Sequence, residues 1–82
     1  MKDKKSHQYF KVSPRNQYYR LWHTPSGDYI QRHLSDFLTR KDAIACRNRV
    51  VSAAPEWDWS DPTFLQNTSA EIFQRIWKAI YA

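Results

Sequence analysis

The residues of this sequence best suited to bind a transition metal or to act as a nucleophile are three histidines and one cysteine. His23 and His33 fall on predicted strands, His7 lies near the N-terminus, and Cys46 occupies the middle of a predicted helix. Their spacing matches no zinc site, and no pattern typical of an activated thiol surrounds Cys46. We therefore expect no metal site and no Cys–His nucleophile.

Other catalytic patterns are also missing from the sequence. The only glycine is Gly27, so there is no glycine-rich phosphate-binding loop. Asp36, Asp42 and Asp58 are placed as turn and helix-cap residues rather than as an acid–base pair. We predict that the protein is not an enzyme and that it uses no cofactor.

Basic and aromatic side chains, in contrast, interleave on one face of two predicted strands. The 82 residues include 13 Lys and Arg against 8 Asp and Glu, which gives a net charge of +5 and a pI of about 9.6. Rings set between cationic groups can stack on bases and hold phosphates, or they can dock on another protein. The residues of this face are Tyr18, Arg20, Trp22, Tyr29, Gln31 and His33.

Three antiparallel strands are predicted to position these residues. Tyr9–Val12 and Gln17–His23 alternate in polarity around a proline-containing break, and Tyr29–Leu34 follows a turn at Pro25–Asp28. The length of that turn sets the expected register, in which Leu21, Ile30 and Leu34 face inward. The expected cross-strand pairs are Trp22–Gln31, Leu21–Arg32 and Arg20–His33.

A first helix is expected directly after the strands. Thr39–Asp42 has the spacing of a helix cap, and Ala54-Pro55 ends the helix near Ala53. Arg40 and Lys41 stay exposed at its start. Its buried stripe is expected to comprise Ala43, Ile44, Val50, Val51 and Ala54.

A second helix is expected at the C-terminus. Thr68–Glu71 repeats the capping signature, and apolar residues then recur at helical spacing. This stripe has to be buried, either on the domain's own sheet, which is the default, or against a second copy of the chain. Its members are Ile72, Phe73, Ile76, Trp77 and Ile80.

Two further tryptophans lie between the helices, where Trp57 and Trp59 alternate with acidic residues. These rings either cover the thin core or, together with Trp77, form a docking surface for a protein partner. Both interpretations remain open at this point.

These elements predict a single α+β domain over residues 9–82, a three-stranded antiparallel sheet packed with two helices in the order β-β-β-α-α. Residues 1–8 are expected to form a flexible basic tail. No run of 18 apolar residues and no signal-peptide pattern occurs. We therefore expect a cytoplasmic protein without membrane contact, as a monomer or a homodimer.

Residues 9–54 resemble a known DNA-binding module. Three strands followed by residues 37–45 (FLTRKDAIA), which open a helix, look like the arm-type DNA-binding domain of phage and transposon tyrosine recombinases, itself similar to the AP2 domain of plant transcription factors. The resemblance implies that the sheet enters the major groove, with Arg20, Trp22, Gln31 and His33 at bases and Lys11 and Arg15 at phosphates. No recombinase catalytic domain follows in this sequence, and a C-terminal helix stands where that family has a linker.

Two functions are consistent with these features. The leading hypothesis is an accessory protein of a phage or mobile element that binds nucleic acid, DNA rather than RNA, through the sheet face and the basic helix start at Arg40 and Lys41. The alternative is a small inhibitor or adaptor, for example an anti-defence protein of the anti-CRISPR kind. It would bind a host or phage protein through Trp57, Trp59 and Trp77. The choice depends on which face of the sheet the C-terminal helix covers.

Overall fold

The computed structural model describes residues 4–25, 31–61 and 68–82, which form a three-stranded antiparallel sheet followed by two helices. This α+β arrangement confirms the predicted fold class. The strands are β1 (Phe10–Pro14), β2 (Tyr19–His23) and β3 (Arg32–Phe37), in the spatial order β1-β2-β3. The helices are α2 (Arg40–Ala53) and α4 (Ala70–Ile80), and a single helical turn, α1 (Lys4–His7), precedes the sheet.

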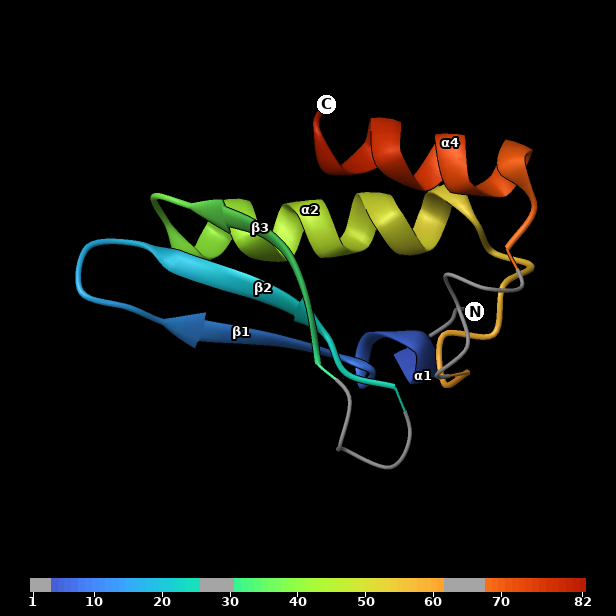
Figure 1. Cartoon of the computed structure of the whole chain (residues 1–82). Helices are drawn as coiled ribbons and strands as arrows, with labels where there is room; N and C mark the ends of the chain where they lie inside the picture. The colour runs from blue at the N-terminus through green and yellow to red at the C-terminus, as the bar shows by residue number, and fades with distance from the viewer. Residues whose placement is uncertain (1–3, 26–30, 62–67) are drawn as a thin grey trace.

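Helix α2 lies between the sheet and α4, and the two long helices run in opposite directions (Figure 1). All three strands contact α2, and α4 packs mainly on α2 rather than on the sheet. No described element covers the other side of the sheet, which we call the outer sheet face. The C-terminal helix therefore lies on the same side of the sheet as the first long helix.

The hydrophobic core lies where the inner side of the sheet, α2 and α4 meet. Leu21 and Val50 are fully buried at its centre. Cys46 is also fully buried, whereas Ile44, which the sequence analysis placed in the stripe, is only partly buried. Ala43, Cys46 and Val50 follow one another at helical spacing, so Ile44 projects to the side of that line. The core cluster comprises Phe10, Leu21, Cys46, Val50, Val51, Ala54, Trp59, Ile76 and Ile80.

The pairing of β2 with β3 differs from the expected register. Trp22 lies opposite His33, and Arg20 lies opposite Asp36, so the predicted partners were wrong. The register shifts between Leu21 and Trp22, because β3 carries one extra residue there, Leu34, as in a β-bulge. Period-two alternation cannot reveal such an insertion.

The third strand also lies further along the chain than predicted. It begins at Arg32 and continues to Phe37 through a segment that the sequence analysis treated as a link to the helix. Leu21 consequently pairs with Ser35 instead of Arg32. Most of the predicted turn, together with Tyr29 and Ile30, lies outside the described residues.

Both long helices begin with a side-chain cap. The Thr39 hydroxyl accepts a hydrogen bond from the Asp42 amide at 3.1 Å, as its spacing predicts. The second cap is Ser69, one residue after the predicted Thr68, and its hydroxyl accepts from the Ile72 amide at 3.3 Å. Each cap satisfies a backbone donor that the first helical turn leaves without a partner.

A short helical turn precedes the sheet. Lys4–His7 forms this turn and contacts α2, within the residues 1–8 that are predicted to be a flexible basic tail. The Tyr9 amide donates to the Ser6 carbonyl at 3.2 Å, and the Thr24 amide donates to the Tyr9 carbonyl at 2.7 Å. These bonds join the turn to β1 and to the end of β2.

Two side chains of α2 bind the last turn of α4. Arg49 Nε donates to the Ala79 carbonyl at 3.0 Å, and the Cys46 thiol donates to the Ile80 carbonyl at 3.8 Å. The last carbonyl groups of a helix accept no hydrogen bond from a backbone amide of the same helix. A positively charged side chain near them therefore stabilises the helix end. These contacts hold the last turn of α4 against α2.

We predict that Arg49→Met lowers the free energy of unfolding by about 1–2 kcal/mol, because the charged hydrogen bond to Ala79 is lost while the aliphatic stem is kept. Urea denaturation followed by circular dichroism measures this. Arg47→Met is the matched control, since the only described hydrogen bonds of the Arg47 guanidinium go to the neighbouring Asn48. Equal losses in both variants would contradict the capping role.

Candidate nucleic-acid interface

A row of three side chains crosses the outer sheet face, one from each strand. Lys11 of β1 lies opposite Trp22 of β2, which lies opposite His33 of β3. The Trp22 and His33 rings contact each other with centroids 5.6 Å apart. The row holds an ammonium group, an indole and an imidazole side by side, which suits contact with bases and phosphates. The adjacent residues of β2, Leu21 and His23, are buried on the opposite side.

Arg20 is held in a defined orientation beside this row. Its Nε donates to Asp36 Oδ1 at 3.0 Å and its Nη2 to Asp36 Oδ2 at 3.4 Å, and Nη2 also donates to the Tyr18 hydroxyl at 3.1 Å. The guanidinium carbon lies 5.8 Å from the Trp22 ring centroid and 5.5 Å from that of Tyr18. A two-pronged ion pair flanked by aromatic rings restricts the rotation of the guanidinium.

Asp36 is the residue of this surface that sequence reasoning missed. It was read as a turn residue, but it lies on β3 and its carboxylate accepts from Arg20 and binds His33 Nε2 at 2.8 Å. The Arg20 hydrogen bond holds the pKa of the Asp36 carboxyl below its ordinary value, with a smaller contribution from His33. The outer sheet face is therefore less basic than its Arg and Lys residues alone suggest.

Three further basic residues gather at one end of the sheet. Arg15 follows β1 at the hairpin, where its amide donates to the Tyr18 carbonyl at 2.8 Å, and Arg40 and Lys41 open α2 directly after β3. The ends of β1 and β3 both pair with Tyr19, so the hairpin and the start of α2 share the left end of Figure 1. All three side chains are exposed.

Gln31 does not join either group. It precedes β3, at the end of that strand remote from Arg40 and Lys41, and it is exposed. The structure thus brings together Lys11, Arg20, Trp22 and His33 on the outer sheet face. It places the three end residues apart from that set.

The tryptophans of the alternative docking surface differ in their exposure to solvent. Trp59 is 2% exposed and belongs to the core, where its ring contacts Phe10 at 5.2 Å between centroids. It is not available as a surface anchor, which corrects that part of the prediction. Trp57 is partly buried against the core, whereas Trp77 is 52% exposed. Burial therefore supports the covering role for the segment after α2.

His23 and Cys46, the two candidate reactive groups that are fully buried, take part in packing. His23 Nε2 lies 2.7 Å from the Trp59 carbonyl, and because a carbonyl only accepts, this nitrogen carries a proton and donates it. Burial lowers the pKa of His23 and raises the pKa of the Cys46 thiol. The imidazole is consequently neutral near pH 7, and the thiol stays protonated, which makes it a poor nucleophile.

Within the described parts of the chain, no three His, Cys, Asp or Glu side chains come close enough together to hold a metal ion. In the same residues, none of the helices has the length and apolar character needed to cross a bilayer. Comparisons with protein-family models, with curated proteins and with solved structures found no match.

Proposed function

We propose that the protein is a small nucleic-acid-binding accessory protein that contacts DNA through its outer sheet face. The observation that carries the proposal is the position of α4, which packs beside α2 and leaves that face uncovered by any described element. The resemblance of residues 9–54 to the arm-type domain adds the major groove as the binding site and a phage or mobile element as the source. The cytoplasm is the compartment in which such a protein meets its DNA.

The two groups of basic residues have different roles in this proposal. Phosphates are contacted by the ammonium of Lys11 and by the end residues Arg15, Arg40 and Lys41. These contacts supply salt-dependent affinity without sequence preference. A short sheet fits the width of the major groove, as an α-helix does. The sheet then lies in the groove while its end lies against the backbone.

Arg20 is the residue proposed to read a base. Asp36 and the Tyr18 hydroxyl accept from its Nε and Nη2 atoms, so among the described residues Nη1 is the guanidinium nitrogen that keeps its donors for a base. A phosphate at this position would be repelled by the Asp36 carboxylate, whereas a base edge would not. The Arg20–Asp36 pair therefore suits a single acceptor on a base edge, such as O6 or N7 of guanine, better than the DNA backbone.

Titration of labelled duplex DNA, single-stranded DNA and duplex RNA over a series of salt concentrations tests the proposal. We expect duplex DNA to bind most tightly, with log affinity falling linearly against log salt and a slope of about −0.9 per phosphate contact. Absence of DNA binding at low salt would rule out the proposal.

Substitutions on the outer sheet face separate phosphate contacts from base contacts. We expect Lys11→Ala to reduce the salt slope by about 0.9, because one phosphate contact is lost. Trp22→Ala should weaken binding with little change in the slope, because the indole loses its apolar contact with base edges in the groove. Lys78→Ala removes the same charge as Lys11→Ala from the exposed side of α4 and serves as the matched control.

Thermal denaturation of the same variants checks their folding. Trp22 lies on the outer sheet face and is only partly buried, so the Tm of Trp22→Ala should stay close to that of the parent protein. A large loss of stability would instead assign this ring a core role. If Lys78→Ala weakened DNA binding as much as Lys11→Ala, the sheet face would not be the interface.

A further inference from the structure

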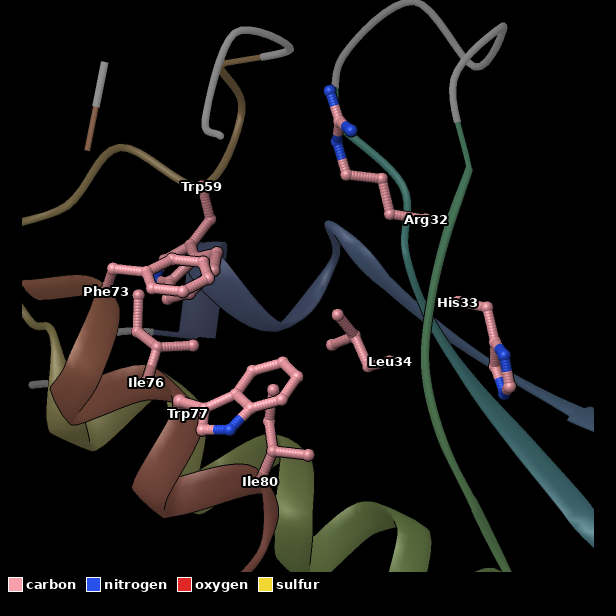
Figure 2. A pocket seen from close by; sticks show the side chains of 8 residues that line it. All are labelled: Arg32, His33, Leu34, Trp59, Phe73, Ile76, Trp77 and Ile80. Carbon is pink, nitrogen blue, oxygen red and sulfur yellow. The ribbon is translucent and has the colours of Figure 1, made fainter. Parts of the chain in front are cut away.

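An apolar groove separates α4 from β3 and shares one residue, His33, with the row on the outer sheet face. Its volume is about 230 Å³. Figure 2 shows Leu34 of β3 and Trp77 of α4 facing each other across it, with Arg32 and His33 at its β3 side. The residues lining it are Arg32, His33, Leu34, Trp59, Phe73, Ile76, Trp77 and Ile80.

An exposed aromatic stripe extends this groove along α4. Phe73, Trp77 and Tyr81 are 41%, 52% and 60% exposed, and their rings contact one another at centroid distances of 6.0 and 4.9 Å. Ile76 and Ile80 already supply the buried side of α4. Helical spacing predicts that the whole apolar stripe is buried, but α4 is apolar over a wider arc than its packing on α2 uses. Exposed apolar surface of this kind marks an interaction site.

We propose that the groove and the aromatic stripe bind an acidic amphipathic helix of a partner protein. The rings follow one another at about the 5.4 Å pitch of an α-helix. An amphipathic helix lying alongside α4 presents its own apolar anchors with the same repeat. One of these anchors would enter the groove next to Trp77, and its neighbours would pack on Phe73 and Tyr81.

Charge complementarity selects the partner. Among the described residues that line the groove none is acidic, and the two with ionisable side chains, Arg32 and His33, are basic residues. Lys78 is exposed on α4 directly after Trp77. The whole chain carries a net charge of +5. On the β3 side of the groove Arg32 therefore attracts carboxylates that lie beside the apolar anchors of the partner, whereas Asp36, 2.8 Å from His33 Nε2, offsets the charge of His33.

The same features disfavour other occupants. A second copy of this chain would bring the same basic margins and would be repelled. The aliphatic walls supplied by Leu34, Ile76 and Ile80 offer a nucleobase no polar partner for its edges. The volume of about 230 Å³ is below the roughly 300–1,000 Å³ of small-molecule pockets, and it suits a single large side chain.

Synthetic peptides provide the test. We would measure fluorescence anisotropy of three labelled helical peptides: one with leucines at helical spacing and glutamates between them, one with lysines in place of the glutamates, and one with serines in place of the leucines. The acidic amphipathic peptide should bind at least tenfold more tightly than either of the others. Amide shifts on binding should map to Leu34, Ile76 and Ile80.

Variants link binding to the groove. Trp77→Ala should weaken binding of the acidic peptide at least tenfold. Leu38→Ala should leave this binding unchanged, although Leu38 is also an exposed apolar residue, with 82% of its surface accessible. Because Trp77 is half exposed, its variant should retain the parent Tm; Phe73→Ser provides a second, independent change in the stripe.

Three results would overturn the proposal: no peptide binding, equal binding of the acidic and basic peptides, or unchanged binding by both stripe variants. Single-stranded DNA that shifts the groove amides and competes with the peptide would assign the groove to nucleic acid and also overturn it. Failure here is separable from failure of the DNA proposal, because Lys11→Ala and Trp22→Ala should leave peptide binding unchanged.

Discussion

Replacing Trp59 with alanine is expected to lower the free energy of unfolding by about 3–5 kcal/mol. The ring is 2% exposed, and it packs with centroid distances of 5.2 Å to Phe10 and 5.4 Å to His23. Truncation removes this buried surface and leaves a cavity between the sheet and α4 that the backbone cannot readily close. For 82 residues, typical stabilities per residue give a total of about 4–12 kcal/mol. The expected loss is thus a large share of the total free energy of unfolding.

Two other tryptophans, Trp57 and Trp77, supply the controls for this prediction. Trp57→Ala should cost less, since its ring is only partly buried, and Trp77→Ala should cost least. Urea denaturation of each variant, followed by far-ultraviolet circular dichroism, ranks the three. If Trp59→Ala were no more destabilising than Trp77→Ala, the segment after α2 would not be the cover of the core described above.

The second large effect is a loss of stability as the pH falls from 7 to 5, caused by His23. Burial lowers the pKa of this imidazole in the folded protein from its ordinary value of 6.5, and the nearby Arg32 cation lowers it further. The hydrogen bond to the Trp59 carbonyl acts in the opposite direction but does not outweigh burial. The folded state therefore favours the neutral ring.

The direction of the pH dependence follows from proton uptake. At a pH between the pKa of His23 in the folded protein and its ordinary value, the unfolded chain binds more protons than the folded protein. Acid therefore favours unfolding. The free energy of unfolding should begin to fall near pH 6.5 and continue to fall by at most about 1.4 kcal/mol per pH unit. Below the pKa of His23 in the folded protein, the contribution of His23 to the free energy of unfolding should no longer change with pH.

His23→Gln isolates this contribution. The variant loses ring packing against Phe10 and Trp59, so it should be less stable than the parent at pH 7. Its stability should nevertheless change little between pH 7 and 5, because the titrating group is gone. An unchanged pH slope in the variant would show that another group is responsible for the acid sensitivity.

Several features of the fold were predictable because they depend on neighbours in the sequence. The Thr39 cap, the start of α2 and its end near Ala53 follow from side-chain hydrogen bonds and a proline within a few residues. Alternation likewise placed Leu21 and His23 on one face of β2, opposite Arg20 and Trp22. These residues lie where the alternation predicts.

The candidate interface was only partly predictable for the same reason. Lys11, Arg20, Trp22 and His33 share a face because strand periodicity holds over short distances. The ion pair of Arg20 with Asp36 was missed because the extra residue at Leu34 shifts every later position of β3. A bulge depends on how two strands meet, and no composition or period within β3 signals it.

The sequence by itself determined the order of the elements, the α+β class and the apolar side of each helix, since capping bonds and periodicity act over one or two turns. The tertiary structure alone decided that α4 lies on α2, that Trp59 enters the core while Trp77 stays exposed, and that no described element covers the outer sheet face. Periodicity states that a stripe such as that of Phe73, Ile76 and Trp77 is apolar. Which part of it is buried depends on the shape of the surface it meets, and that surface exists only once the chain has folded.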